Sequence, residues 1–224
     1  MIWSDVTQLV GAILLVLGAV LPVVNPLGDA PIFLRMTPGC DEATRALLAR
    51  SIALYSFFIV LGSLLLGSFV LAVFGLSIPV VQVAGGAVVC ALAWSVLADS
   101  PKPADVALDP LHARQIALGR AITPLTLPMT IDAGTISVAI TVGAFHANSF
   151  KHTVIQLLAA VIGAGVIALC ILLTYRYAHR ASGKIGHIGM LVLIRLSAFI
   201  MLCIGVGISW NGIKSLLAEV GIHG

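Results

Sequence analysis

The sequence predicts an all-α polytopic membrane protein with six transmembrane helices, arranged as a 3+3 inverted-topology repeat in which helices 1 and 4 are broken. Three observations predict this fold. The 224-residue chain is 60% hydrophobic and 9% charged, with a mean hydropathy of +1.13, whereas soluble domains carry about 25% charged residues. Weakly charged windows recur along it, each near the roughly 20 residues that a spanning helix needs. Two of these windows contain clusters of proline, glycine and polar residues.

The windows fall into two groups of three on either side of a linker, 99–116, that is rich in proline and charge. The first repeat is therefore expected at 1–98 and the second at 117–224. Because each repeat has an odd number of spans, the two must cross the membrane in opposite directions. The expected spans are 7–24, 51–74, 80–98, 121–145, 153–175 and 190–213.

Two segments would be surface turns in a soluble protein but here lie in membrane spans. The first is Asn25 to Pro31, and the second is Thr123 to Pro128, running on to Thr135. Each proline lacks a backbone donor and breaks the helical hydrogen-bond ladder. In hydrocarbon the freed groups need partners from protein or from a wet cavity. Half-helix ends of this kind bind small solutes in secondary transporters, so we expect a substrate site where the two breaks meet.

The basic residues are unevenly distributed between the two sides of the membrane. One side carries only Lys151 and Lys214. By the positive-inside rule, both termini are expected on the periplasmic side. No polybasic tract is present, so nucleic acid is not an expected partner. The other side carries Arg35, Arg45, Arg50, Lys102, Arg114, Arg120, Arg176, Arg180 and Lys184.

Asp29 and Asp132 are the only acids well inside the expected spans. An acid at a helix centre is unfavourable by about 2.5–3.5 kcal/mol, so such residues often mark ion or substrate paths. We therefore expect that one or both bind a coupling cation, a proton or sodium, or the ammonium of an amino acid. The alternative is that each aspartate caps the half-helix that follows it.

Neutral groups near the breaks suit a small zwitterion, whose carboxylate would face helix N-termini and whose ammonium would face freed carbonyls. For any single threonine, the alternative of re-satisfying a released carbonyl is the stronger one. For Asn25, a role in the substrate site is the stronger expectation. The other candidate substrate-binding residues are Gly28, Thr123, Thr126, Thr130, Gly134 and Thr135.

Arg195 and Gln82 are the candidate gate or ion-pair residues. Arg195 lies a few residues into the sixth span and either pairs with Asp132 or with freed carbonyls, or reaches the interface by snorkelling. Gln82 belongs to the polar patch of the third span, which aligns with the patch around Arg195 in the sixth.

No enzyme, metal site or cofactor is predicted. The four cysteines form no Cys-x-x-Cys pair, and no Gly-x-Ser-x-Gly, P-loop or His-Glu-x-x-His motif occurs. No two histidines have metal-ligand spacing on one helical face. They are His112, His146, His152, His179, His187 and His223.

Several motifs together resemble the MarC-type integral membrane proteins of bacteria. They are the block from Asn25 to Leu34, the Val83 to Gly86 patch, the block from Pro124 to Ile136, and Arg195. This chain departs from the family pattern in having Ile131 to Gly134 where the family tends to have Ala-Gly-Pro-Gly. It also departs in two single residues, Gln82 for a common arginine and Ala198 for a common glycine.

The resemblance implies a six-span protein of the bacterial inner membrane, in a family classed with small neutral amino acid transporters. The expected function is therefore secondary transport of a small neutral amino acid across the inner membrane; the sequence leaves the direction of transport open, and export is one of the two directions. A non-transporting membrane scaffold or assembly protein is the alternative, and drug efflux is a weaker one because aromatic residues are only 6% of the chain. A homo-oligomer is compatible with the sequence.

Overall fold

The computed structural model describes residues 2–98, 119, 121–143 and 150–219. The expected linker, 99–116, lies outside the described residues, as do Lys102, His112, Arg114, Arg120, His146 and His223. The helices are α1 (Ile2–Val24), α2 (Pro26–Met36), α3 (Glu42–Val73), α4 (Ile78–Ala98), the irregular helix η1 (Ala121–Thr130), α6 (Ala133–Gly143) and α7 (Phe150–Glu219).

The described residues form five candidate membrane spans, or six if the bent pair of η1 and α6 counts as one. The helices α1 and α2 together provide one span, Asp5–Met36. Two spans lie within α7, and we call Thr153–Arg180 its first arm and Leu191–Ala218 its second arm. The protein is therefore an all-helical, multi-pass membrane protein.

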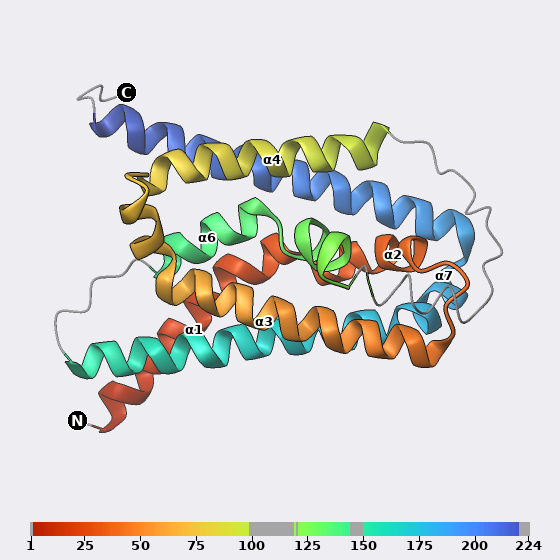
Figure 1. The fold of residues 1–224 in the computed structure, drawn as a ribbon, viewed down its shortest axis with the longest axis horizontal. Coiled ribbons are helices and arrows are strands. Elements are labelled where there is room, and N and C mark those ends of the chain that lie inside the picture. Colours follow the sequence, from red (N-terminus) through yellow and green to blue (C-terminus); the bar gives the residue numbers. More distant parts are fainter. Residues whose placement is uncertain (1, 99–118, 120, 144–149, 220–224) are drawn as a thin grey trace.

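The helices lie in three layers (Figure 1). On one side, α3 lies beside the first arm of α7, and on the other side α4 lies beside the second arm. Between them lie α1, α2, η1 and α6, which contact α3, α4 or α7. Both termini lie at the same end of the molecule (Figure 1). The two interrupted segments are thus enclosed by the uninterrupted helices.

The connection between the last two spans differs from the expectation. Separate windows at 153–175 and 190–213 predicted a loop around Arg176, Arg180 and Lys184, but α7 is helical throughout Phe150–Glu219. Figure 1 shows α7 turning back at the end of the molecule opposite to the termini. Hydropathy locates the apolar spans but says little about the polar residues between them, and alanine, arginine and lysine are good helix formers.

The second arm of α7 packs against α4 at glycines. A Cβ atom added to Gly205 would lie 2.8 Å from Cys90 Sγ and 2.9 Å from Gly86 O. One added to Gly212 would lie 2.7 Å from Pro79 O. Small residues of this kind allow transmembrane helices to approach backbone to backbone. This contact holds the second arm of α7 beside α4, and both of them lie against the two breaks.

Candidate functional site

The first break is a single residue, Asn25, between α1 and α2. Asn25 has left-handed dihedral angles, φ 44° and ψ 56°, which asparagine tolerates better than most residues. Its backbone N–H still donates to Leu21 O at 3.0 Å. Its side-chain Oδ1 accepts a hydrogen bond from Gly28 N at 3.3 Å. Asn25 is therefore the N-cap of α2, the half-helix that follows the break.

The second break is longer and more irregular. Thr123 and Leu127, the residues before the two prolines of η1, have extended dihedral angles inside this short element. The axis then bends by 68° between η1 and α6. Asp132 Oδ1 accepts a hydrogen bond from Thr135 N at 2.7 Å, at the start of α6. Asp132 thus has the capping role in the second break that Asn25 has in the first.

The buried threonines of the second break bond to its backbone. Thr126 Oγ1 donates to Ala121 O at 2.7 Å, and Thr130 Oγ1 donates to Leu125 O at 2.7 Å. Thr123 is exposed. These are side-chain bonds to backbone carbonyls, as was expected for any single threonine, but the acceptors are Ala121 and Leu125 rather than the carbonyls four residues before the two prolines. Thr126 and Thr130 therefore hold the irregular backbone of η1 together.

A polar pair joins this break to α7. Thr130 Oγ1 and Tyr175 OH are 2.9 Å apart, and both residues are buried. The Tyr175 ring stacks on Phe33 of α2 with 4.7 Å between ring centroids. Tyr175 was not singled out from the sequence. The available signal was a tyrosine inside an apolar span, because a buried phenol usually has a hydrogen-bond partner.

Glycines at both breaks make close contacts with the enclosing helices. A Cβ atom on Gly28 would lie 2.6 Å from Cβ of Ser197, on the second arm of α7. Gly134 packs in the same way against Val89 of α4. A Cβ on Gly85 of α4 would lie 2.9 Å from Ala133 O. The second arm therefore holds the first break, and α4 holds the second.

Asp29 lies one turn into α2 and does not cap it. Its side chain accepts no hydrogen bond from the described residues, although the residue is only 7% exposed. It interacts electrostatically with Asp132 and with Tyr175. The buried residues of the described chain include these two aspartates and no lysine or arginine. The breaks thus share an acidic centre without a basic side chain.

A cavity of about 180 Å³ lies where the two breaks meet. Asp29 is the charged residue in its lining, and Pro124 and Pro128 of the second break also line it. Three of the five methionines of the chain contribute to the wall. The full lining is Asp29, Ile32, Met36, Leu92, Ser95, Val96, Pro124, Pro128, Met129 and Met201.

Neither candidate gate residue pairs with Asp132. Gln82 Nε2 donates to Thr141 Oγ1 of α6 at 3.0 Å, which ties α4 to α6. Arg195 is exposed, whereas Asp132 is 3% exposed and is bonded to Thr135 N. The pairing of Arg195 with Asp132 is therefore absent. Its exposure near the start of the second arm fits snorkelling to the interface instead.

The described residues contain no group of three or more histidine, cysteine, aspartate or glutamate side chains that could hold a metal ion. In the same part of the chain, Cys40, Cys90, Cys170 and Cys203 are all free thiols. The polar groups at the breaks are thus carboxylates, an amide and hydroxyls. These groups can bind a small cation or a hydrogen-bonding solute.

Comparison with known proteins agrees with this architecture. Residues 10–217 match the family described as MarC family integral membrane protein. The chain belongs to the MarC family. It is 29% identical over 195 residues to the membrane protein YvbG of Bacillus subtilis, covering 87% of this chain and 90% of that protein. It is 27% identical over 223 residues to the inner membrane protein MarC of Salmonella typhimurium, covering 95% and 97%. No solved structure matches.

Proposed function

We propose that this MarC family protein is a secondary transporter of small neutral amino acids in the bacterial inner membrane. The observation that carries the proposal is the cavity of about 180 Å³ between the two breaks, with Asp29 in its wall. A scaffold needs no such space at membrane depth, where voids and unpaired acids are both unfavourable. The solute would lie where the half-helices meet.

The chemistry of the cavity suits a cationic group on a small solute. Asp29 and Asp132 are buried near each other, and no buried lysine or arginine in the described chain offsets them. Buried charges are usually paired, so the ammonium of the amino acid, a proton or sodium would supply the missing charge. Of the two half-helix N-termini, that of α2 contributes Asp29 to the cavity lining and that of α6 contributes no residue.

An inverted repeat would give the site its alternating access. In each half, a polar side chain caps the half-helix that follows the break by accepting a hydrogen bond from the backbone N–H three residues later. Asn25 accepts it from Gly28, and Asp132 accepts it from Thr135. In each half, too, the break packs against the third span of the other half, Gly28 against Ser197 and Ala133 against Gly85. These reciprocal contacts support the 3+3 interpretation, in which one repeat rocks against the other.

The proposal is tested by counterflow in proteoliposomes. Purified protein is reconstituted with unlabelled glycine or alanine inside, and entry of the labelled amino acid is followed with and without a proton or sodium gradient. We expect exchange in the protein-containing vesicles, and we expect the coupling cation to stimulate net movement. Absence of exchange for every small neutral amino acid, with correctly folded protein, would favour the scaffold alternative.

Drug efflux is less compatible with the cavities of the described chain. The cavity beside Asp29 and the larger cavity described below are both lined without an aromatic side chain. Pockets for drug-sized ligands are rich in aromatic and hydrophobic side chains. The cavity beside Asp29, at about 180 Å³, is also below the size range of roughly 300–1,000 Å³ that such ligands need, whereas the larger cavity, at about 590 Å³, is within it.

A further inference from the structure

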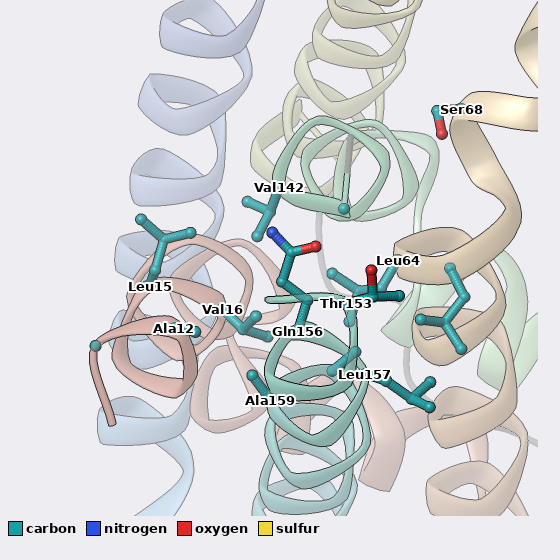
Figure 2. Close-up of a pocket in the computed structure, with 14 residues that line it drawn as sticks. Ala12, Leu15, Val16, Leu64, Ser68, Val142, Thr153, Gln156, Leu157 and Ala159 are labelled. Atoms are coloured by element: carbon teal, nitrogen blue, oxygen red, sulfur yellow. The ribbon is translucent and has the colours of Figure 1, made fainter. Parts of the chain in front are cut away.

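A second, larger cavity lies in the half of the molecule that carries the termini. It has a volume of about 590 Å³ and lies between α1, α3, α6 and the first arm of α7, open on one side (Figure 2). Small residues line it on α1, among them Gly11 and Ala12. The full lining is Gly11, Ala12, Leu15, Val16, Leu64, Leu65, Ser68, Val142, Gly143, Thr153, Gln156, Leu157, Ala159 and Ala160.

Gln156 is the amide in this otherwise largely apolar wall. Figure 2 shows its side chain reaching from α7 into the centre of the lining, toward Val142 of α6. The residue is half-buried, and its amide forms no hydrogen bond with the described residues. An amide without a partner in an apolar environment is costly. Because no described residue supplies a partner for the half-buried Gln156, that partner is water or a bound molecule.

The two cavities are separate. They share no lining residue. Between Val16, which lines the larger cavity, and Asp29, which lines the smaller one, α1 contributes the fully buried Val20 and Val24. A packed layer thus divides two spaces that lie on opposite sides of the breaks. This is the arrangement that a carrier with alternating access requires.

We propose that the larger cavity is a water-filled vestibule on the side of the termini, and that it contains a second binding site in which Gln156 contacts the transported amino acid. The inference rests on the proposed function. A glutamine amide has two N–H donors and a carbonyl acceptor, so it can bond to either end of a zwitterion. The apolar wall and the absence of charge among the lining residues make this a transit site of weak affinity.

The competing occupant is a lipid acyl chain. The rim residues Leu15, Leu65 and Leu157 are 41–47% exposed and would contact lipid. An acyl chain, however, offers no hydrogen bond to the Gln156 amide, and in hydrocarbon such a group must be satisfied. Water or a zwitterionic solute offers that bond. A cavity filled with water admits a charged reagent, whereas a cavity filled with an acyl chain excludes it. This difference provides the test.

The test measures access of a charged, membrane-impermeant thiosulfonate to single cysteines in intact cells. The four native cysteines, none of which lines the cavity, are first replaced by alanine. Ala12→Cys and Gln156→Cys place thiols in the cavity. Leu14→Cys and Leu158→Cys are the matched controls, because these residues are 61% and 46% exposed and lie about 200° around the same helices. Labelling after unfolding in detergent confirms that every thiol is present.

We expect the two cavity thiols to react at least tenfold faster than the two controls when the reagent is outside the cell. Equal, slow reaction at all four positions would overturn the vestibule and indicate an acyl chain. If the cavity thiols react only with reagent on the cytoplasmic side, the termini and this cavity do not lie on the periplasmic side, and that part of the proposal is overturned.

The contact with Gln156 is tested in the Ala12→Cys background. Excess alanine should slow labelling of the cysteine, and adding Gln156→Leu should abolish this protection.

In counterflow, Gln156→Leu should raise KM about three- to tenfold with little change in kcat, as expected for one lost hydrogen bond. Gln156→Asn should restore part of the affinity. Protection that persists in Gln156→Leu would overturn the role of Gln156. If cavity thiols are labelled but no amino acid is exchanged, the vestibule stands and the proposed function fails.

Discussion

Asn25 and Asp132 show how one side-chain oxygen restarts a helix at membrane depth. Each accepts an N–H from the residue three positions later, Gly28 and Thr135 respectively. Asn25 does so from left-handed backbone angles, whereas Asp132 lies after the irregular residues of η1. Because water cannot satisfy the first N–H groups of a helix in hydrocarbon, these caps have no substitute from solvent.

Substitution of Asn25 should separate its two contributions. Asn25→Ala loses the cap and places a Cβ residue at φ 44° without a local hydrogen bond, so we expect a loss of about 1–3 kcal/mol. Asn25→Gly loses the cap but adopts the backbone freely. Thermal melting in detergent should therefore rank wild type above Asn25→Gly and Asn25→Gly above Asn25→Ala. Equal melting of the two variants would show that the backbone conformation contributes nothing.

The aspartates differ in a way that their residue type alone does not reveal. The sequence predicted that either acid binds a cation or that each caps a half-helix. The capping role is present at Asp132 and absent at Asp29, where Asn25 performs it instead. Asp29 was a reasonable cap candidate because it follows two helix-breaking residues. The left-handed Asn25 starts α2 four residues earlier, and this choice depends on backbone angles that the sequence does not specify.

Asparagine variants should therefore have unequal effects. Asp132→Asn keeps a capping oxygen, and asparagine and aspartate cap about equally well, so stability should change by only a few tenths of a kcal/mol. Asp29→Asn keeps the shape of the side chain but removes the charge from the cavity wall. We expect Asp29→Asn to retain counterflow and to lose stimulation by the cation gradient. Retained stimulation in both variants would remove the aspartates from coupling.

At the scale of the elements, glycine suits close contact between transmembrane helices, but the sequence alone does not assign its partner. On α3, a Cβ atom on Gly67 would collide with Ile140 of α6, whereas one on Gly62 would meet no atom within 4 Å. Of these two glycines, only Gly67 makes such a contact. Sequence composition identifies glycines suited to contact, but the rotation of the helix about its own axis decides which of them faces a neighbour.

The contact between α4 and the second arm of α7 gives a test with an internal control. A Cβ at Gly205 would lie 2.9 Å from Gly86 O and 3.0 Å from Cys90 N, and backbone atoms cannot move without separating the helices. Gly205→Ala should destabilise the fold by about 1–3 kcal/mol through overpacking. Gly207→Ala, two residues along the same helix, would meet no atom within 4 Å and should be neutral or stabilising. Melting temperatures in one detergent compare the two, and similar losses would contradict the interface.

At the scale of the whole molecule, the sequence predicted the helical class, most span positions and the places of the breaks, because hydropathy and proline act locally. It did not predict the cavities. Their walls combine residues from distant helices, such as Asp29 of α2, Ser95 of α4 and Met201 of α7. Nor did it identify Tyr175 as the partner of Thr130, because a pairing across 45 residues depends on how the layers assemble.

The volume of the smaller cavity favours a small transported solute. About 180 Å³ accommodates an amino acid with a small side chain, and the rigid Pro124 and Pro128 limit expansion on one side. In counterflow, glycine, alanine and serine should therefore compete with one another, whereas phenylalanine and tryptophan should not. Met201→Ala removes a flexible side chain from the wall and should extend exchange to leucine, while Leu196→Ala, on the same arm of α7 but 53% exposed and outside the lining, should not. Methionine is the wall residue to change because its unbranched chain fills irregular space and tolerates substitution. Competition by tryptophan in the wild-type protein would place the solute outside this cavity and leave Asp29 without the role proposed for it.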